Sequence, residues 1–152
     1  TVSSAASDVY KRQDIGSGGG MPGIIVAIIL KNMKNNMNVH LYEKSYHKSH
    51  FLKEVSKKLN LNTKVFQKNI FEIKNLETGT IMSRAFKPMP VVLELVYENF
   101  SKYKNLIFFM GKSGKKIFEN SKKNWELEYI EKKSLTSEDS FLINIKKIKK
   151  KN

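Results

Sequence analysis

The stretch of sequence that decides the fold is Asp14-Ile15-Gly16-Ser17-Gly18-Gly19-Gly20-Met21-Pro22-Gly23. Its alternating glycines let the backbone turn tightly and approach a ligand without a Cβ in the way. The apolar residues that follow, with Pro22 at a suitable first position, predict a helix over residues 22–33. Free N–H groups at the start of such a helix favour a carboxylate or a phosphate. The stretch therefore predicts a strand end, a glycine-rich loop and a helix arranged around a small molecule.

The next strand supplies an acid that narrows the choice of ligand. Residues 38–42 alternate as a strand, and Glu43 follows directly, where a carboxylate can hydrogen-bond both hydroxyls of an adenosine ribose. The dinucleotide fingerprint G-x-G-x-x-G would require glycine at position 21, which is Met21. An acid at Asp14 with glycine at position 20 suits S-adenosylmethionine better, with its amino-acid end facing Asp14 and the loop. We predict this cofactor, and an oxidoreductase domain that binds a nucleotide cofactor remains the alternative.

Apolar spacing in the rest of the chain alternates between helical and strand periods. We expect the helix over residues 44–59 to bury Phe51, Leu52, Val55 and Leu59. Further helices are expected over residues 90–100 and 115–124. Strands are expected over residues 63–67, 81–84, 105–110, 126–130 and 141–145, with a polar loop at 134–140. This order predicts a Rossmann-like α/β fold with a mostly parallel sheet and an antiparallel C-terminal edge. The lysine-rich residues 146–151 are interpreted as a solvated, frayed end.

Composition bears on partners and location. The 152 residues carry 28 Lys and Arg against 14 Asp and Glu, a formal net charge of +14. Such an excess attracts polyanions such as a phosphate backbone, although a codon bias toward lysine would produce it without function. The absence of cysteine excludes disulfides, thiolate metal ligands and a cysteine nucleophile. No apolar run approaches the ~18 residues of a bilayer span and no secretory signal opens the chain, so we expect a cytoplasmic protein without membrane contact.

The first thirteen residues differ from the rest. Residues 3–13, Ser-Ser-Ala-Ala-Ser-Asp-Val-Tyr-Lys-Arg-Gln, match the translation of a transposase sequencing adapter. We therefore interpret residues 1–13 as a non-native segment and residues 14–152 as the native domain. Since this segment stands where the first strand of the sheet should be, that strand is expected to be lost or replaced.

The glycine-rich stretch resembles the motif of the glucose-inhibited division protein B family, the 16S ribosomal-RNA (guanine-N7)-methyltransferases. The resemblance continues through Glu43-Lys44-Ser45, through Lys48, and through Phe51-Leu52-Lys53-Glu54-Val55. It returns at Ser83-Arg84-Ala85-Phe86-Lys87-Pro88-Met89, whose Arg-Ala-Phe is the most specific mark, and it covers nearly all of residues 14–152. The resemblance implies a class I S-adenosylmethionine-dependent methyltransferase fold and methyl transfer to N7 of a guanine in 16S ribosomal RNA. In this family a helical N-terminal region and the first strand precede the part matched here.

Carried over by position, the resemblance implies where the cofactor and the RNA bind. Cofactor contacts are expected from Asp14, Gly16, Gly18, Met21, Glu43, Ile70, Phe71 and Arg84, with Ile70 and Phe71 flanking the adenine. RNA contacts are expected from Arg84, Lys87 and Lys112, and the partner is 16S ribosomal RNA or the small ribosomal subunit. The sequence departs from the family at Asn69-Ile70-Phe71, where an Arg–small–Glu run is usual, and at Met110-Gly111-Lys112, where Lys-Gly is usual.

The implied reaction requires no general base. Guanine N7 carries an in-plane lone pair and no proton, so direct displacement needs alignment, which positioning alone can supply. We therefore predict no catalytic side chain and no metal site, and we interpret His47 and His50 as part of a solvated face. A methyltransferase with a non-RNA substrate remains an alternative. We expect a monomer, and we expect this chain to be inactive without its native first strand.

Overall fold

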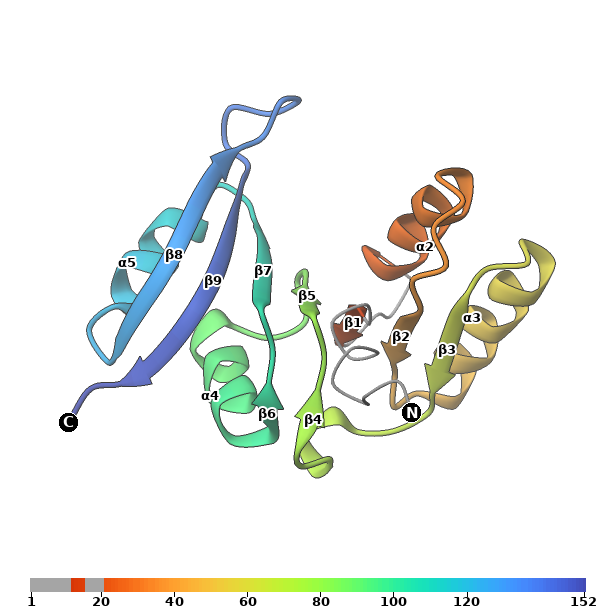
Figure 1. Ribbon diagram of the computed structural model, residues 1–152. Coiled ribbons are helices and arrows are strands. Elements are labelled where there is room, and N and C mark those ends of the chain that lie inside the picture. Colours follow the sequence, from red (N-terminus) through yellow and green to blue (C-terminus); the bar gives the residue numbers. More distant parts are fainter. Residues whose placement is uncertain (1–11, 16–20) are drawn as a thin grey trace.

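The computed structural model describes residues 12–15 and 21–152, which form a twisted sheet flanked by helices (Figure 1). The described strands are β1 (Arg12–Ile15), β2 (Val39–Tyr42), β3 (Thr63–Phe66), β4 (Leu76–Glu77), β5 (Thr80–Ser83), β6 (Phe100–Lys102), β7 (Asn105–Met110), β8 (Trp125–Lys133) and β9 (Phe141–Lys150). The helices are α2 (Gly23–Asn32), α3 (Tyr46–Lys58), α4 (Met89–Asn99), α5 (Gly114–Ser121) and the 3-10 helix η1 (Ile70–Glu72).

Within the described residues the main sheet has seven strands in the order β3-β2-β1-β5-β7-β9-β8, and β4 pairs with β6 separately. The pairs from β3 through to β7 are all parallel, whereas β9 runs antiparallel to both β7 and β8. The chain leaves β1 toward β2 and β3 and later resumes on the other side at β5, which makes the β1–β5 boundary a topological switch point. In the dinucleotide-binding order 3-2-1-4-5-6, no returning strand separates the fifth and sixth strands. The inserted β9 therefore distinguishes this sheet from that of a dinucleotide-binding domain.

The central strand is present, although its first two residues come from the segment interpreted as non-native. β1 pairs with β2 on one side and β5 on the other, and Arg12 is in register with Val39 and Thr80. Arg12 and Gln13 thus contribute half of the four residues of β1. The central strand of the sheet is therefore formed, and the non-native origin of residues 1–13, with the replacement of the native strand, stays a prediction.

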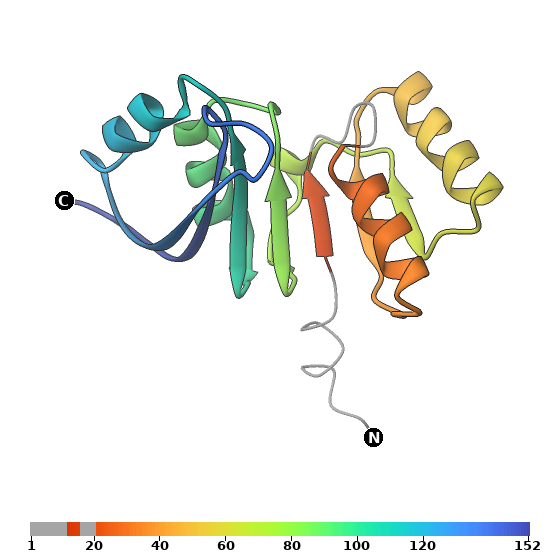
Figure 2. The same cartoon turned by 90° about the horizontal axis from the view of Figure 1, so that it is seen from above.

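Two apolar clusters hold the layers together on either side of the sheet. One joins α2 and α3 to Val39 and Leu41 of β2. The other joins α4 and α5 to β5, β7 and β9, and it also contains Tyr42, the next residue after Leu41. Successive residues of a strand point to opposite faces, so the two clusters lie on opposite faces of the sheet. Figure 2 shows α2 and α3 beside one half of the sheet, and α4 and α5 beside the other half.

The buried face of α3 differs from the expected one. Leu52 is fully buried, but Phe51 and Leu59 are exposed, and the other buried residues of this helix are Ser49 and Ser56. The Ser49 hydroxyl donates to the Tyr46 carbonyl at 2.9 Å, which satisfies a polar group under the helix. The prediction for Phe51 and Leu59 was wrong because serine is small enough to sit at a close contact between helix and sheet, where hydrophobic spacing gives no signal.

The lysine-rich tail is also not frayed. β9 extends to Lys150, and this last residue of β9 pairs with Trp125, the first residue of β8. Ile148 packs against the larger core cluster, and Lys150 Nζ lies 2.7 Å from Glu94 Oε1 on α4. Ile148 and the ion pair hold this segment in the sheet, so the expectation of a frayed end was wrong, although its lysines are exposed as expected.

Candidate functional site

The predicted site residues gather at the carboxyl edge of the parallel strands. Glu43 follows β2, Asn69 and the helix η1 follow β3, Arg84 follows β5, and Gly111 follows β7. Ligands of open α/β sheets bind at this edge, next to the switch point. The described residues line two separate cavities here, one on each side of the β5 end.

The first cavity has a volume of about 720 Å³, and we call it the Glu43 cavity. Glu43 is 8% exposed, and its Oε1 accepts a hydrogen bond from the Ser45 backbone N–H at 2.8 Å. This bond holds the carboxylate at the C-terminal end of β2, where it lines the cavity. Tyr42 also lines it and stacks on Phe66 at 4.8 Å between ring centroids. Burial raises the pKa of Tyr42, so its phenol stays neutral.

The apolar residues Ile70 and Phe71 line the Glu43 cavity, and a residue of α4 fixes the turn that carries them. Ile70 is 3% exposed, while Phe71 is partly exposed and lies 6.0 Å from Phe86 between ring centroids. The buried Asn99 side chain donates from Nδ2 to the carbonyls of Phe71 at 3.0 Å and Ile73 at 2.7 Å. A weaker contact at 3.4 Å reaches the carbonyl of Ile70. Asn99 therefore fixes the turn that presents Ile70 and Phe71.

The second cavity has a volume of about 830 Å³ and lies between the β5 and β7 ends and the loop that joins β8 to β9. We call it the hairpin cavity. Arg84 lines it, together with Phe109 and Met110 of β7 and Lys132 and Lys133 of β8. The sequence prediction placed Arg84 among both the cofactor and the RNA contacts, and Arg84 is not among the described residues that line the Glu43 cavity. The structure separates it from Glu43, Ile70 and Phe71.

The other predicted residues have mixed outcomes. Lys87 lines the Glu43 cavity, whereas Lys112 is exposed and lines neither cavity. Met21 is 45% exposed in the turn before α2. Asp14 lies in β1 by its backbone, but its side chain is outside the described residues, as are Gly16 and Gly18.

Sequence reasoning missed most of the cations around both cavities. Lys44, Lys48 and Lys68 join Lys87 around the Glu43 cavity, and all four side chains are exposed. In a chain with 28 Lys and Arg residues a single lysine carries little information. The available signal was position, because Lys44 and Lys68 follow the ends of β2 and β3 within two residues.

Other site types receive no support from the described part of the chain. His47 and His50 are exposed on α3, as expected of a solvated face. Among residues 12–15 and 21–152, no three His, Asp or Glu side chains are grouped so as to hold a metal ion. No described helix is long and apolar enough to cross a bilayer.

Comparison with solved structures defines the class of fold. M. capricolum TrmK, solved in complex with the natural cofactor product S-adenosyl-homocysteine, matches with a TM-score of 0.61 at 17% identity, over 95% of this chain and 68% of that chain. A ribosomal protein L11 methylase from Lactobacillus delbrueckii subsp. bulgaricus matches with a TM-score of 0.60 at 14% identity, over 93% and 70%. The fold is the Rossmann-like fold of class I methyltransferases.

Sequence comparison then defines the family. The family model described as GidB, rRNA small subunit methyltransferase G, matches residues 2–143. The ribosomal RNA small subunit methyltransferase G of Pelagibacter ubique is 66% identical over 139 residues, which is 91% of this chain. This chain belongs to that family, as the glycine-rich and Arg-Ala-Phe motifs predicted. It spans 65% of the length of the Pelagibacter ubique relative. The family match begins at residue 2, within the segment interpreted as non-native.

Proposed function

We propose that this protein transfers the methyl group of S-adenosylmethionine to N7 of a guanine in 16S ribosomal RNA. The observation that supports it most is the pairing of a buried carboxylate, Glu43, with an apolar turn, Ile70 and Phe71, around one cavity at the switch point of a methyltransferase fold. Membership of the small-subunit RNA methyltransferase family supports the choice of substrate. We also propose that the protein is cytoplasmic and that it is a monomer. Sedimentation would test the monomeric state.

The residues around the Glu43 cavity fit the adenosine part of this cofactor. A carboxylate has two oxygens with about four acceptor sites, so Glu43 can hold the Ser45 N–H and still accept from ribose hydroxyls. Phe71 and Ile70 offer apolar contact to an adenine ring, and the Asn69 side chain, which accepts from the Phe71 N–H and donates to Glu72, holds their turn in place. The amino-acid end of the cofactor would reach toward Asp14 and the glycine loop.

When bound, the cofactor supplies an electrophilic methyl carbon on a sulfonium sulfur. As the methyl group moves to N7, the C–S bond breaks, a thioether is left and the guanine ring gains the positive charge. No proton is released in this step, so the protein needs no base and acts by orientation. In this proposal Glu43 holds the ribose, η1 holds the adenine, and Arg84 guides the incoming nucleotide.

Binding of the cofactor product tests the first half of the proposal. We expect calorimetry to detect S-adenosylhomocysteine binding in preference to NAD or ATP. Glu43→Gln should weaken that binding by about tenfold, because the ribose hydroxyls lose a charged acceptor. Glu54→Gln makes the same change on the exposed surface of α3 and should have no effect. Preferential binding of NAD would instead support the oxidoreductase alternative.

Methyl transfer tests the second half. With labelled S-adenosylmethionine and 16S ribosomal RNA, nucleoside mass spectrometry should find N7-methylguanosine. The assay uses the chain beside its Arg12→Val, Gln13→Leu variant, because we expect the replaced first strand to limit activity. Label on an exocyclic amine, on a pyrimidine or only on a non-RNA acceptor would contradict the proposal.

A further inference from the structure

The hairpin cavity is not needed for the cofactor in the proposal above, and its lining suggests a different ligand. Three exposed cations face it, namely Arg84, Lys132 and Lys133, and no acidic residue is among the described residues that line it. Two half-buried aromatic rings, Phe109 and Phe141, lie on the β7 and β9 side. Cations beside aromatic rings match a nucleotide, whose phosphate is anionic and whose base has a π-face.

The loop above this cavity is an ordered structure. The Ser134 N–H donates to the Ser140 carbonyl at 2.8 Å, and the Ser140 hydroxyl donates to the Ser137 hydroxyl at 3.2 Å. The Thr136 N–H donates to the Ser134 hydroxyl at 3.2 Å. These bonds preform the loop of residues 134–140, which reduces the entropy lost when a ligand binds beneath it.

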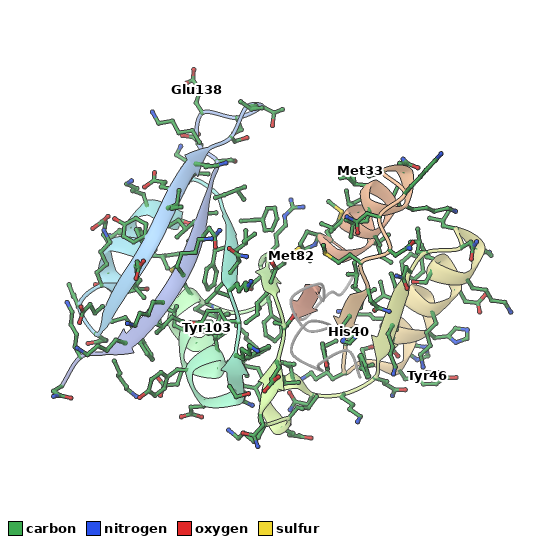
Figure 3. All side chains as sticks on the ribbon, in the orientation of Figure 1. Met33, His40, Tyr46, Met82, Tyr103 and Glu138 are labelled. Atoms are coloured by element: carbon green, nitrogen blue, oxygen red, sulfur yellow. The ribbon has the colours of Figure 1, made fainter. Side chains whose placement is uncertain are left out.

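The base of the same hairpin is braced from α5. Lys115 Nζ lies 2.9 Å from Glu131 Oε2 and 5.8 Å from the centroid of the Phe141 ring. Lys115 neutralises the charge of Glu131, the acid next to Lys132 on β8. The positive charge of Lys132 and Lys133 is therefore not cancelled by Glu131. The acid at the tip of the loop, Glu138, points away from the sheet (Figure 3). Asp139 lies in the same loop, but neither it nor Glu138 is among the described residues that line the cavity, so the charged lining is cationic.

One side chain of the loop is out of place on a solvated hairpin. Leu135 is fully exposed, at 102%, and it lines the hairpin cavity. An apolar side chain at the rim of a cationic pocket can contact a base, as apolar wedges of RNA- and DNA-binding proteins do.

We propose that the hairpin cavity binds the acceptor nucleotide of the RNA, with Lys132 and Lys133 on flanking phosphates, Arg84 and the aromatic rings around the base, and Leu135 against it. This inference rests on the proposed function, and it assigns the β8–β9 hairpin to substrate binding. Arg84 then faces the RNA, and Ala85 begins the wall of the cofactor cavity.

A double variant with a matched control tests this assignment. Lys132→Ala, Lys133→Ala should weaken binding to a 16S ribosomal RNA transcript by roughly tenfold and lower the log–log salt slope by about one to two. Its affinity for S-adenosylhomocysteine should not change. Lys57→Ala, Lys58→Ala removes the same charge from the end of α3, at the opposite edge of the sheet, and should cost much less RNA affinity.

The outcomes separate this inference from the proposed function. Equal weakening by both double variants would overturn it, because RNA would then sense only net charge. An unmodified protein that binds S-adenosylhomocysteine but no RNA would instead reject the RNA substrate itself. Leu135→Ser offers a second measurement, since it cannot disturb the core and should reduce RNA affinity at constant charge. An unchanged affinity for Leu135→Ser would remove the leucine contact from the inference.

Discussion

Arg84 and Ala85 are consecutive residues, yet Arg84 lines the hairpin cavity and Ala85 lines the Glu43 cavity. The backbone between them turns because Ala85 has a φ of 47°, in the left-handed region. A residue with a Cβ is disfavoured there, and such strain persists only where the surrounding structure imposes it. The strained backbone at Ala85 thus places Arg84 in the hairpin cavity and Ala85 in the Glu43 cavity. Ala85 therefore lies between the proposed RNA and cofactor sites.

We expect Ala85→Gly to raise the free energy of unfolding by up to about 1 kcal/mol. Glycine removes the Cβ clash of the left-handed conformation, which outweighs its greater freedom in the unfolded chain. Urea titration followed by circular dichroism measures the change. Lys104→Gly, at an exposed position without positive φ, should lower stability instead. A loss of stability in both variants would show that Ala85 is not strained.

Arg84→Lys keeps the charge but removes the planar fork of the guanidinium. If Arg84 holds a base or phosphate through two parallel hydrogen bonds, the change should slow methyl transfer by about tenfold. S-adenosylhomocysteine affinity should stay the same, because Arg84 does not line the Glu43 cavity. A parallel fall in S-adenosylhomocysteine affinity would return Arg84 to the cofactor site.

Asn99→Asp should disturb the η1 turn that lines the Glu43 cavity. The Asn99 amide donates to carbonyls of the η1 turn, and aspartate would place an acceptor against them. We expect a loss of about 1–3 kcal/mol in unfolding free energy, as for a buried acceptor left unpaired. S-adenosylhomocysteine affinity should also fall at temperatures where the variant is fully folded. Lys74→Met removes the exposed donor to Asn99 Oδ1, together with a surface ion pair to Glu98, and should leave that affinity unchanged.

Much of the fold could be predicted because its signals are local. The run Asn105–Met110 is apolar after its first residue and half of its residues are β-branched or aromatic, and it forms β7 with the expected bounds. The position of β9 between β7 and β8 could not be predicted, because two antiparallel strands can join a sheet in either order. The two-residue strand β4 carries too short a pattern to be recognised.

The candidate site was predictable only in part, for a related reason. Glu43 and the η1 turn follow strand ends along the chain, so their convergence at one edge follows from parallel pairing. The hairpin cavity depends on residues 132–142 folding back over the β5 and β7 ends, a long-range contact without a sequence motif. Lys132 and Lys133 were therefore missed among the other lysines.

Ile148→Ala tests the finding that the lysine-rich tail belongs to the sheet. Ile148 is half-buried and packs against the core, so its truncation should cost about 1–2 kcal/mol, below the range for a fully buried isoleucine. Ile130→Ala makes the same change on β8 at a side chain that is 53% exposed, and it should be nearly neutral. Equal and small effects would mean that the tail is frayed in solution.

The last prediction concerns the central strand, where Arg12 and Gln13 occupy positions that an α/β sheet normally fills with apolar residues. A parallel strand covered on both faces is nearly all apolar, and adjacent residues point to opposite faces. Position 12 is in register with Val39 and position 13 with Ile81, and both of these neighbours are fully buried.

Replacing Arg12 by Val and Gln13 by Leu should therefore stabilise the chain by roughly 1–3 kcal/mol, since it removes a charge and adds apolar contact. S-adenosylhomocysteine should bind more tightly as well, because β1 leads into the glycine loop. Thermal melts and calorimetry of both proteins measure the two effects, and Gln67→Leu at an exposed site controls for added hydrophobicity. A cooperative melt and tight binding by the unmodified chain, equal to those of the variant, would show that the sheet tolerates Arg12 and Gln13 in its central strand.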